Sequence, residues 1–413
     1  MQVLVLGADG FIGRHIAFHL RAKGYEVLAV ARAPARLAAM GFATLRADLT
    51  DRDTHAPAFW AAHLRPGSNL VNAAGLLTGT DDAFRAVHVL APQAALQALP
   101  AGGVAVLISA VGIAADTPFA RWRRQTEAVF ADHTILRPGL VLAETSYGGS
   151  SLLRALAALP FVTPVVGSGT QSFNPVHAAD LAAVVEGCLI NPPAARLMEV
   201  GGPEVMSQLQ LIQTYRGWLG LPAARVLRLP LAMARVIGRL GDALRLGPIS
   251  TTSVAQLQAG VLAKAAPLPQ PLRGVSAFVS ARPAGTQDLW QARLYLLKPL
   301  IRLTLAAMWL LSAGLGLLLP GAAFLPALPG IPEGLALALA RLGGVVDLAL
   351  GLALLRNWQP RGVALAQLAV VAGYTLGLTV MASALWADPL GGMLKNLPVL
   401  ALILTHLALA KER

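Results

Sequence analysis

The chain opens with Met1-Gln2-Val3-Leu4-Val5-Leu6-Gly7-Ala8-Asp9-Gly10-Phe11-Ile12-Gly13, an apolar run of strand length followed by three glycines spaced three residues apart. An amphipathic stretch, Phe11 to Lys23, follows directly. Glycine permits a tight turn and a close approach of the backbone to a diphosphate, and a helix N-terminus attracts negative charge. The pattern therefore predicts a strand, a turn and a helix that together bind a dinucleotide.

A second strand is expected at Glu26–Val30, with Gly24 closing the helix before it. Chains that bind NAD usually place Asp or Glu after this strand, where the carboxylate accepts hydrogen bonds from the ribose hydroxyls. Here Ala31 and Arg32 follow, with Arg36 one turn later. Cations at this position favour the 2′-phosphate of NADP. We therefore expect NADP, with NAD still possible; the alternative is that both arginines are solvated loop residues.

Further strands are expected at residues 43–48, 69–75, 104–109 and 134–139, separated by segments of helix length. This alternation predicts an α/β fold of the Rossmann type, a doubly wound parallel sheet with a smaller α/β lobe after it. Ligands on such sheets bind beyond the carboxyl ends of the strands. Asp48, Gly75, Ser109 and Pro138 are expected at that edge.

Five motifs in this region resemble those of extended or atypical short-chain dehydrogenases/reductases: the glycine motif, Asp48-Leu49, Asn72-Ala73-Ala74-Gly75, Ser109-Ala110-Val111-Gly112 and Leu136-Arg137-Pro138-Gly139. Within that family the chain is similar to the NADPH-binding accessory subunits of respiratory complex I, in which the nucleotide mainly organises structure. The resemblance implies an NADP site, with NAD possible, built from Gly7, Asp9, Gly10, Phe11, Ile12, Gly13, Arg32, Arg36, Asp48, Leu49, Ala73, Ala74, Gly75, Arg123, Pro138 and Gly139.

The catalytic pair of that family is replaced in this chain. Its reaction centre is a Tyr followed four residues later by a Lys, with an upstream Ser in support. Phe119 stands at the Tyr position and Arg123 at the Lys position, while Ser109 remains. Phenylalanine transfers no proton and arginine stays charged. Two hypotheses stay open: catalysis through another acid, for which Tyr147 and His177 are candidates, or nucleotide binding without standard carbonyl chemistry.

The C-terminal part is apolar enough to cross a membrane four times, at Leu300–Leu319, Leu335–Leu355, Val363–Trp386 and Leu394–Ala410. It resembles the DoxX-like membrane family through residues 302–306 and 388–396. The expected organisation is an NAD(P)-binding domain at residues 1–285, an interfacial linker helix at 286–299 and an all-α four-helix transmembrane bundle at 300–413.

Basic residues gather on one side of the predicted spans. They precede the first span, lie between the second and third, and follow the fourth; these are Lys298, Arg302, Arg356, Arg361, Lys411 and Arg413. The positive-inside rule then places both termini and the nucleotide domain in the cytoplasm, at the inner membrane. Arg341 and Asp347 lie inside the second span, where they form either a polar ligand site or a structural contact.

Composition limits the partners. The 413 residues carry a net charge of +12 and are 55% hydrophobic. Because the cations are scattered and are not interleaved with aromatic residues, we expect no nucleic-acid binding, and a lipid bilayer surface explains the charge. The single cysteine, Cys188, permits no intramolecular disulfide, and the dispersed histidines predict no metal site. The sequence favours an oxidoreductase whose substrate is lipophilic and membrane-delivered. The alternatives are a catalytically silent NADPH-binding assembly factor and a membrane redox or transport module with a nucleotide-sensing domain. The sequence does not identify a protein partner.

Overall fold

The computed structural model describes residues 1–114, 116–259, 261–264, 268, 270–327, 330–389 and 391–410. The contacts within it divide the chain into two compact units. One comprises residues 1–240 and 247–293, and we call it the nucleotide unit. The other comprises residues 241–246 and 294–413, and we call it the membrane unit.

The nucleotide unit is built on a seven-stranded sheet in the order β11-β6-β5-β4-β1-β2-β3, in which every pairing is parallel. Its strands are β1 (Gln2–Leu6), β2 (Glu26–Ala31), β3 (Ala43–Arg46), β4 (Asn69–Asn72), β5 (Ala105–Ile108), β6 (Thr134–Pro138) and β11 (Leu197–Val200). The expected parallel, doubly wound sheet is confirmed, and β11 is an additional edge strand that the sequence analysis did not anticipate.

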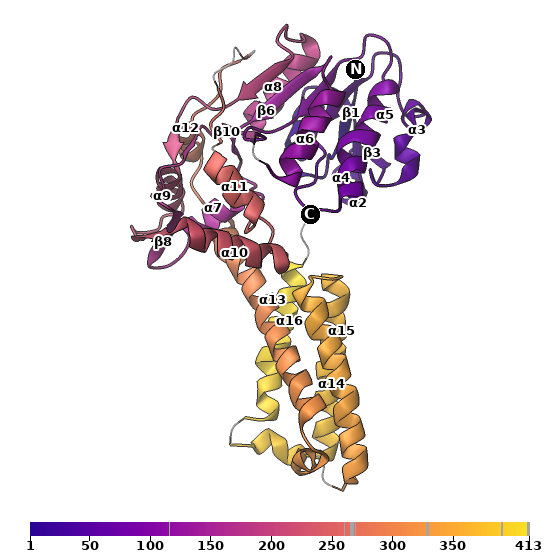
Figure 1. Ribbon diagram of the computed structural model, residues 1–413, viewed down its shortest axis with the longest axis vertical. Helices are drawn as coiled ribbons and strands as arrows, with labels where there is room; N and C mark the ends of the chain where they lie inside the picture. The colour runs from indigo at the N-terminus through magenta and orange to yellow at the C-terminus, as the bar shows by residue number, and fades with distance from the viewer. Residues whose placement is uncertain are drawn as a thin grey trace. The chain divides into compact units, whose positions relative to one another are not determined.

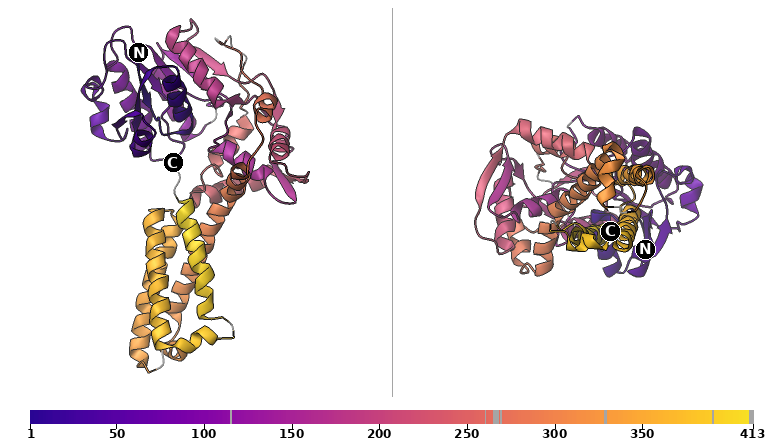
Figure 2. Two further views of the ribbon diagram at one scale, coloured as in Figure 1. Left: turned by 180° about the vertical axis from the view of Figure 1, so that it is seen from behind. Right: turned by 90° about the horizontal axis from the view of Figure 1, so that it is seen from below.

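The sheet is covered on both faces because successive side chains of a strand point in opposite directions. Val3 and Val5 join a core with helices α1 (Phe11–Ala22) and α8 (Ala178–Ile190). Leu4 and Leu6 join a second core with α3 (Pro57–Ala61), α5 (Ala91–Gln97) and the end of α6 (Pro118–Val129). Figure 1 shows the sheet from the side of α5 and α6, and Figure 2 (left) shows it from behind.

The remaining elements of this unit are short, and several of them form a smaller lobe after β6. They are α2 (Ala35–Ala39), α4 (Asp81–Arg85), β7 (Val141–Leu142), α7 (Gly149–Ala157), β8 (Val162–Val166), β9 (Ser172–Phe173), β10 (Val176–His177), β12 (Met206–Ser207), α9 (Gln208–Trp218), β13 (Arg225–Leu229), α10 (Leu231–Ala243), α11 (Thr251–Ala259) and α12 (Val275–Ser280). In the lobe, β7 pairs with β10, β8 with β13 and β9 with β12. Its core joins α7, α9 and α12 through Leu153, Ile212 and Phe278.

The membrane unit is helical and contains α13 (Thr286–Leu318), α14 (Glu333–Leu355), α15 (Pro360–Met381) and α16 (Asn396–Leu409), with α13 beginning in the nucleotide unit. Side chains from all four helices share one core, which includes Trp309, Leu350, Val371 and Ile403. Figure 2 shows this bundle from behind and from below. Among the described residues, α13, α14 and α15 are long and apolar enough to cross a membrane, and the segment Met393–Leu409 is a shorter apolar helix.

Three details of the membrane half differ from the sequence expectation. The interfacial helix expected at 286–299 and the first span form one continuous helix, α13, which includes Pro299. The third span, expected to reach Trp386, ends as an α-helix at Met381, and a 3₁₀ segment occupies Ser383–Ala387. The fourth span begins with the 3₁₀ turn Met393–Lys395, so only Asn396–Leu409 is α-helical.

Candidate functional site

The turn after β1 depends on its three glycines, Gly7, Gly10 and Gly13. Gly7 has a φ of +72°, and a Cβ there would lie 2.8 Å from the Ala74 backbone after β4. The Gly10 N–H donates to the Gly7 carbonyl at 2.9 Å. A Cβ on Gly13 would lie 2.2 Å from that same carbonyl oxygen. The turn therefore brings the start of α1 as close to β1 and β4 as backbone atoms allow.

The first turn of helix α1 has no side-chain cap. Its N-cap is Gly10, which has no side chain to accept a hydrogen bond from the first amides, and the first turn carries no acidic residue. Such a terminus concentrates backbone N–H groups and positive partial charge, which suits an anionic ligand. Because a glycine-lined turn faces a helix terminus of this kind, the residues present fit a dinucleotide diphosphate.

The residues predicted to contact the adenosine half of the nucleotide lie at the ends of β2 and β3. Arg32 follows β2 and Arg36 lies in α2, and both side chains are exposed. Asp48 is partly buried, and its Oδ1 accepts hydrogen bonds from the Thr50 N–H at 3.0 Å and the Thr50 hydroxyl at 2.8 Å. Burial alone would raise the pKa of Asp48. These hydrogen bonds and the charge of Arg32 together have the larger effect, so the pKa of Asp48 lies below its ordinary value. Asp48 is therefore a carboxylate beside Arg32.

The end of β4 is held by Asn72, which is fully buried. Its Oδ1 accepts the Ala74 N–H at 3.0 Å and so bends the chain at Ala73-Ala74-Gly75. Pro138 and Gly139 follow at the end of β6, where the Val111 N–H donates to the Pro138 carbonyl and the Gly139 N–H to the Val200 carbonyl. These strand ends lie along the edge at which parallel sheets bind ligands.

Ser109 contacts a partly buried ion pair. Its hydroxyl donates to Glu127 Oε1 at 2.5 Å. Arg137 donates to the same carboxylate through Nε at 2.8 Å and Nη2 at 2.5 Å. The Glu127 side chain is 9% exposed and that of Arg137 is 24% exposed. A serine hydroxyl whose proton points to a carboxylate does not offer that proton to a substrate.

Phe119 and Arg123 lie one turn apart on α6, with the guanidinium carbon 5.6 Å from the centre of the ring. The Arg123 side chain donates to the carbonyls of Ala74 at 3.3 Å and Ile108 at 3.2 Å. Burial lowers the pKa of Arg123 to about 10, so it stays charged at neutral pH. The arginine thus ties together the ends of β4 and β5, where the family's lysine would hold a ribose.

A buried histidine that the sequence analysis did not single out supports this corner. His88 is fully buried; its Nε2 accepts the Leu76 N–H at 3.1 Å, and its Nδ1 lies 3.1 Å from the Thr126 hydroxyl. Burial, together with the charge of Arg123, lowers the pKa of His88 to about 3, so the ring is neutral. His88 therefore fixes the loop that follows Gly75. No sequence pattern marked it, because both partners are distant along the chain.

Tyr147 and His177, the two alternative acids, have different surroundings. Tyr147 is 54% exposed, and its ring centre lies 6.5 Å from that of Phe11 at the start of α1. His177 is buried; its Nδ1 accepts the Ala179 N–H at 3.2 Å, and its Nε2 lies 3.3 Å from Glu144. Burial lowers the pKa of His177. Tyr147 is thus the acid next to the nucleotide turn, while His177 caps α8.

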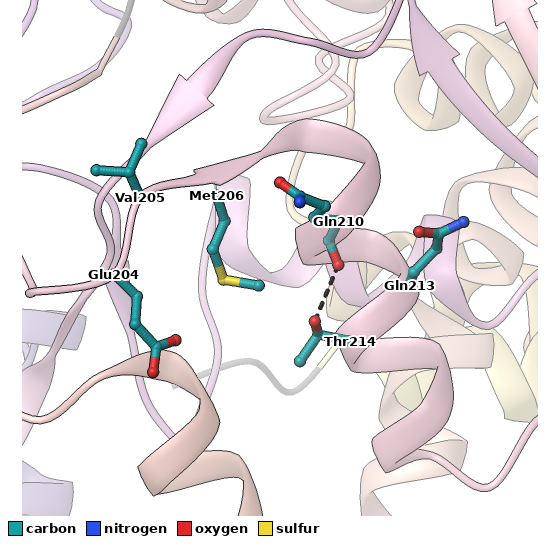
Figure 3. Close-up of a pocket in the computed structure, with 6 residues that line it drawn as sticks. All are labelled: Glu204, Val205, Met206, Gln210, Gln213 and Thr214. Carbon is teal, nitrogen blue, oxygen red and sulfur yellow. Dashed lines mark hydrogen bonds between the residues drawn. The ribbon is translucent and has the colours of Figure 1, made fainter.

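A pocket of the nucleotide unit lies in the smaller lobe, away from the nucleotide turn. It has a volume of about 620 Å³ and is lined by Glu204, Val205, Met206, Gln210, Gln213 and Thr214 (Figure 3). Its polar groups already serve local structure: Ser207 and Gln210 form a capping box on α9, and Glu204 accepts the Ser276 N–H at 3.1 Å. No group of three or more metal-ligating side chains occurs among the described residues.

In the membrane unit, Asp347 and Arg341 have separate partners. Asp347 is 3% exposed and accepts hydrogen bonds from the hydroxyls of Ser312 at 2.6 Å and Tyr374 at 3.4 Å. Arg341 donates to the carbonyls of Gly316 at 2.7 Å and Leu319 at 3.1 Å, near the end of α13. Both residues therefore connect helices of the bundle through hydrogen bonds.

Comparison with known proteins supports the two-part organisation. Residues 3–114 match the model of the NAD dependent epimerase/dehydratase family, and residues 306–404 match that of the DoxX-like family. A curated relative is the mitochondrial NADH dehydrogenase [ubiquinone] 1 alpha subcomplex subunit 9 of Arabidopsis thaliana, 26% identical over 262 residues. That alignment covers 58% of this chain, and the chain spans 62% of the length of the relative.

Solved structures with a similar chain trace include two sugar-nucleotide enzymes. The dTDP-glucose 4,6-dehydratase of Bacillus anthracis, in complex with NAD, has a TM-score of 0.47 at 13% identity and covers 56% of this chain and 84% of its own. The UDP-glucuronic acid 4-epimerase of Bacillus cereus, in complex with UDP-glucuronic acid and NAD, has a TM-score of 0.47 at 16% identity. That alignment covers 71% of this chain and 98% of the epimerase chain. The chain thus joins an NAD-dependent epimerase/dehydratase-like domain to a DoxX-like domain, and its described residues include three long apolar helices.

Proposed function

We propose that this protein is a membrane-anchored NADP(H)-binding protein in which the dinucleotide serves as a bound structural ligand. The observation that supports this most directly is the uncapped start of α1 beside a turn in which Gly7 and Gly13 leave no room for side chains. The diphosphate would lie against the amides of Phe11 and Ile12. When bound, the nicotinamide ring supplies hydride chemistry.

The remaining candidate residues would hold the two ends of the nucleotide. Arg32, supported by Arg36, would contact the 2′-phosphate, and a guanidinium suits that role because it donates in a fixed fork. Asp48 and Leu49 would border the adenine, while Ala73, Ala74, Gly75, Pro138 and Gly139 would face the rest of the cofactor. These roles combine the strand-end positions with the exposed cations of the nucleotide unit.

Proton transfer in the usual manner of the family has little support in these side chains. Phe119 has no ionisable proton, the Ser109 hydroxyl points to Glu127, and Arg123 is engaged with two backbone carbonyls. Binding energy at this site would therefore order the strand ends and not drive carbonyl reduction. The name of the Arabidopsis relative assigns it to an NADH dehydrogenase subcomplex. A structural role in a membrane assembly agrees with that name.

A second candidate function is that of an oxidoreductase acting on a lipophilic or membrane-delivered carbonyl or quinone. Tyr147 favours it, because this half-exposed phenol lies beside Phe11 at the nucleotide turn. Its hydroxyl would supply the proton to the oxygen of the reduced group. Replacing Tyr147 with Phe would then abolish turnover while leaving nucleotide affinity unchanged.

For the membrane unit we propose a place in the inner membrane with the nucleotide unit in the cytoplasm. The cations near the ends of the apolar helices support this orientation through the positive-inside rule. Large side chains such as Leu318, Leu342 and Val380 are more than half exposed on the bundle, as lipid-facing residues are. Accessibility labelling of the nucleotide unit in intact cells and in inverted vesicles tests the orientation.

The deciding experiment is titration of the full-length protein, in lipid nanodiscs, with NADPH and NADH, followed by oxidation assays on quinones and carbonyls. The proposal predicts saturable binding with a preference for NADPH and no turnover. Turnover that disappears in Tyr147→Phe would establish the second candidate in its place. Activity that appears only when Phe119→Tyr and Arg123→Lys are combined would support the structural role, because it shows that the replaced pair is what silences the site.

A further inference from the structure

Helix α10 (Leu231–Ala243) has its small residues inside and its large residues outside. Ala234, Gly238 and Gly241 are buried. A Cβ on Gly238 would lie 3.0 Å from the backbone of Ser250 and Thr251, so this face packs closely against the chain that leads into α11. The small side chains therefore make the contact with the protein, which reverses the usual arrangement of an amphipathic helix.

The opposite face carries four large apolar side chains that are exposed. Met233 is 50% exposed, Val236 53%, Ile237 39% and Leu240 56%. Their spacing of three, four and seven residues places them in one stripe along the helix. Soluble proteins rarely leave such a stripe in water, because each large side chain gains about 1.5–3 kcal/mol when it is fully buried. A contiguous apolar stripe of this kind indicates a binding surface.

Cations flank the stripe. Arg235 and Arg239 are exposed on α10, and Arg245 follows shortly after its end, against one acidic residue, Asp242. Arg235 contacts the Gln258 side chain at 3.4 Å. A helix with a large apolar face and arginines beside it is typical of segments that lie in the plane of a membrane interface.

The end of α10 is attached to the membrane unit, to which residues 241–246 belong. Arg245 donates to the Arg356 carbonyl at 3.1 Å, and Arg302 donates to the Leu244 carbonyl. Arg356 caps the C-terminal end of α14, between two helices long enough to span a bilayer. That connection must lie near a membrane surface, and so must the end of α10.

We propose that α10 is an in-plane membrane helix, with Met233, Val236, Ile237 and Leu240 among the acyl chains of the bilayer that the bundle crosses. Arg235 and Arg239 contact anionic lipid phosphates. Continuity with the membrane unit favours lipid over a second copy of the chain as the occupant. The inference rests on the membrane part of the proposed function and is independent of nucleotide binding.

The test uses full-length protein in nanodiscs of phosphatidylcholine and phosphatidylglycerol, with Cys188→Ala to remove the buried native thiol. A fluorophore is attached at Ile237→Cys or, as the matched control, at Lys23→Cys, an exposed site after α1. Lipids brominated in the acyl chains should quench the probe at position 237 by at least about twofold and leave the probe at position 23 unchanged. Aqueous iodide should do the reverse.

Two outcomes would overturn the proposal. Iodide quenching at position 237 equal to that at position 23 would show a face in water. Protection from both quenchers would show a face covered by protein, such as a second copy. Replacing Arg235 and Arg239 with Glu should weaken lipid quenching only in discs with anionic lipid. Since NADPH binding is measured on the same labelled samples, failure of the nucleotide proposal and failure of this one are distinguishable.

Discussion

Replacement of Gly13 by Ala probes the closest approach in the nucleotide turn. The added methyl would lie 2.2 Å from the Gly7 carbonyl oxygen and 2.9 Å from its carbon, both of them backbone atoms. Because ordinary carbon–oxygen contacts begin at about 3.3 Å, α1 must retreat by about 1 Å. Overpacking of this kind costs about 1–3 kcal/mol. The same shift moves the first amides of α1 away from the diphosphate.

The assay compares thermal unfolding and NADPH affinity of the full-length protein with those of two glycine variants. Gly13→Ala should unfold roughly 2 to 10 °C lower and bind NADPH at least about tenfold more weakly. Gly217→Ala is the matched control: it lies in α9 with no heavy atom within 4 Å of the added methyl. Its unfolding temperature should stay the same or rise, since alanine is the better helix former.

A different pattern would refute the reasoning about the turn. If Gly13→Ala unfolds within about one degree of the parent and binds NADPH equally well, the helix does not depend on close contact with Gly7. If Gly217→Ala is as damaging as Gly13→Ala, the effect belongs to glycine replacement in general and not to the nucleotide turn.

Three other predictions concern charged groups of the same unit. Glu127→Gln should destabilise the protein by about 1–3 kcal/mol, because it leaves the partly buried Arg137 guanidinium facing an amide. Glu26→Gln, in an exposed arginine pair, should cost less than about 1 kcal/mol; equal thermal shifts would contradict this. Arg32→Asp should weaken NADPH much more than NADH in titrations, and equal losses would remove the assignment of the 2′-phosphate site. The folded pKa of His88, about 3, lies below its ordinary value of 6.5, so the unfolded chain binds the proton first and stability falls as the pH drops below 6.5. The loss is about 2 kcal/mol at pH 5; an unfolding temperature with the same pH dependence in His88→Gln would contradict it.

The sheet and the nucleotide turn could be predicted because their signals are local. Apolar runs, glycines and spacers of helix length are patterns within short stretches of sequence. The strands observed at residues 2–6, 26–31 and 134–138 lie close to the positions that these patterns predict. Strand β11 (Leu197–Val200) was missed because it is short and pairs with β6, about sixty residues earlier in the chain. Register over such distances is set by tertiary packing.

The partners of the candidate site residues could not be read from the sequence. Ser109 is an available hydroxyl in the sequence, and only the fold brings Glu127 and Arg137 to it. Arg123 similarly suggested a contact with ribose or phosphate, yet its donors reach the ends of two strands. Which group a long side chain contacts depends on the elements that surround it, and these are distant along the chain.

The membrane half shows the same division between local and distant signals. Hydropathy located the long apolar segments, since it depends on composition alone. It did not reveal that the interfacial stretch and the first span form one helix, because hydropathy marks where apolar composition begins and not where a helix begins. Nor did it reveal that α10 turns its large side chains outward, which depends on how Gly238 packs.

The most direct measurement is a fluorescence titration of the folded full-length protein in nanodiscs, in which NADPH bound near the nucleotide turn accepts energy from the tryptophans. The account predicts a saturable signal with one site per chain, displaced by NADP and shifted to at least about tenfold higher NADPH concentration in Gly13→Ala. A parent protein that remains folded by circular dichroism and yet binds neither NADPH nor NADH would contradict it.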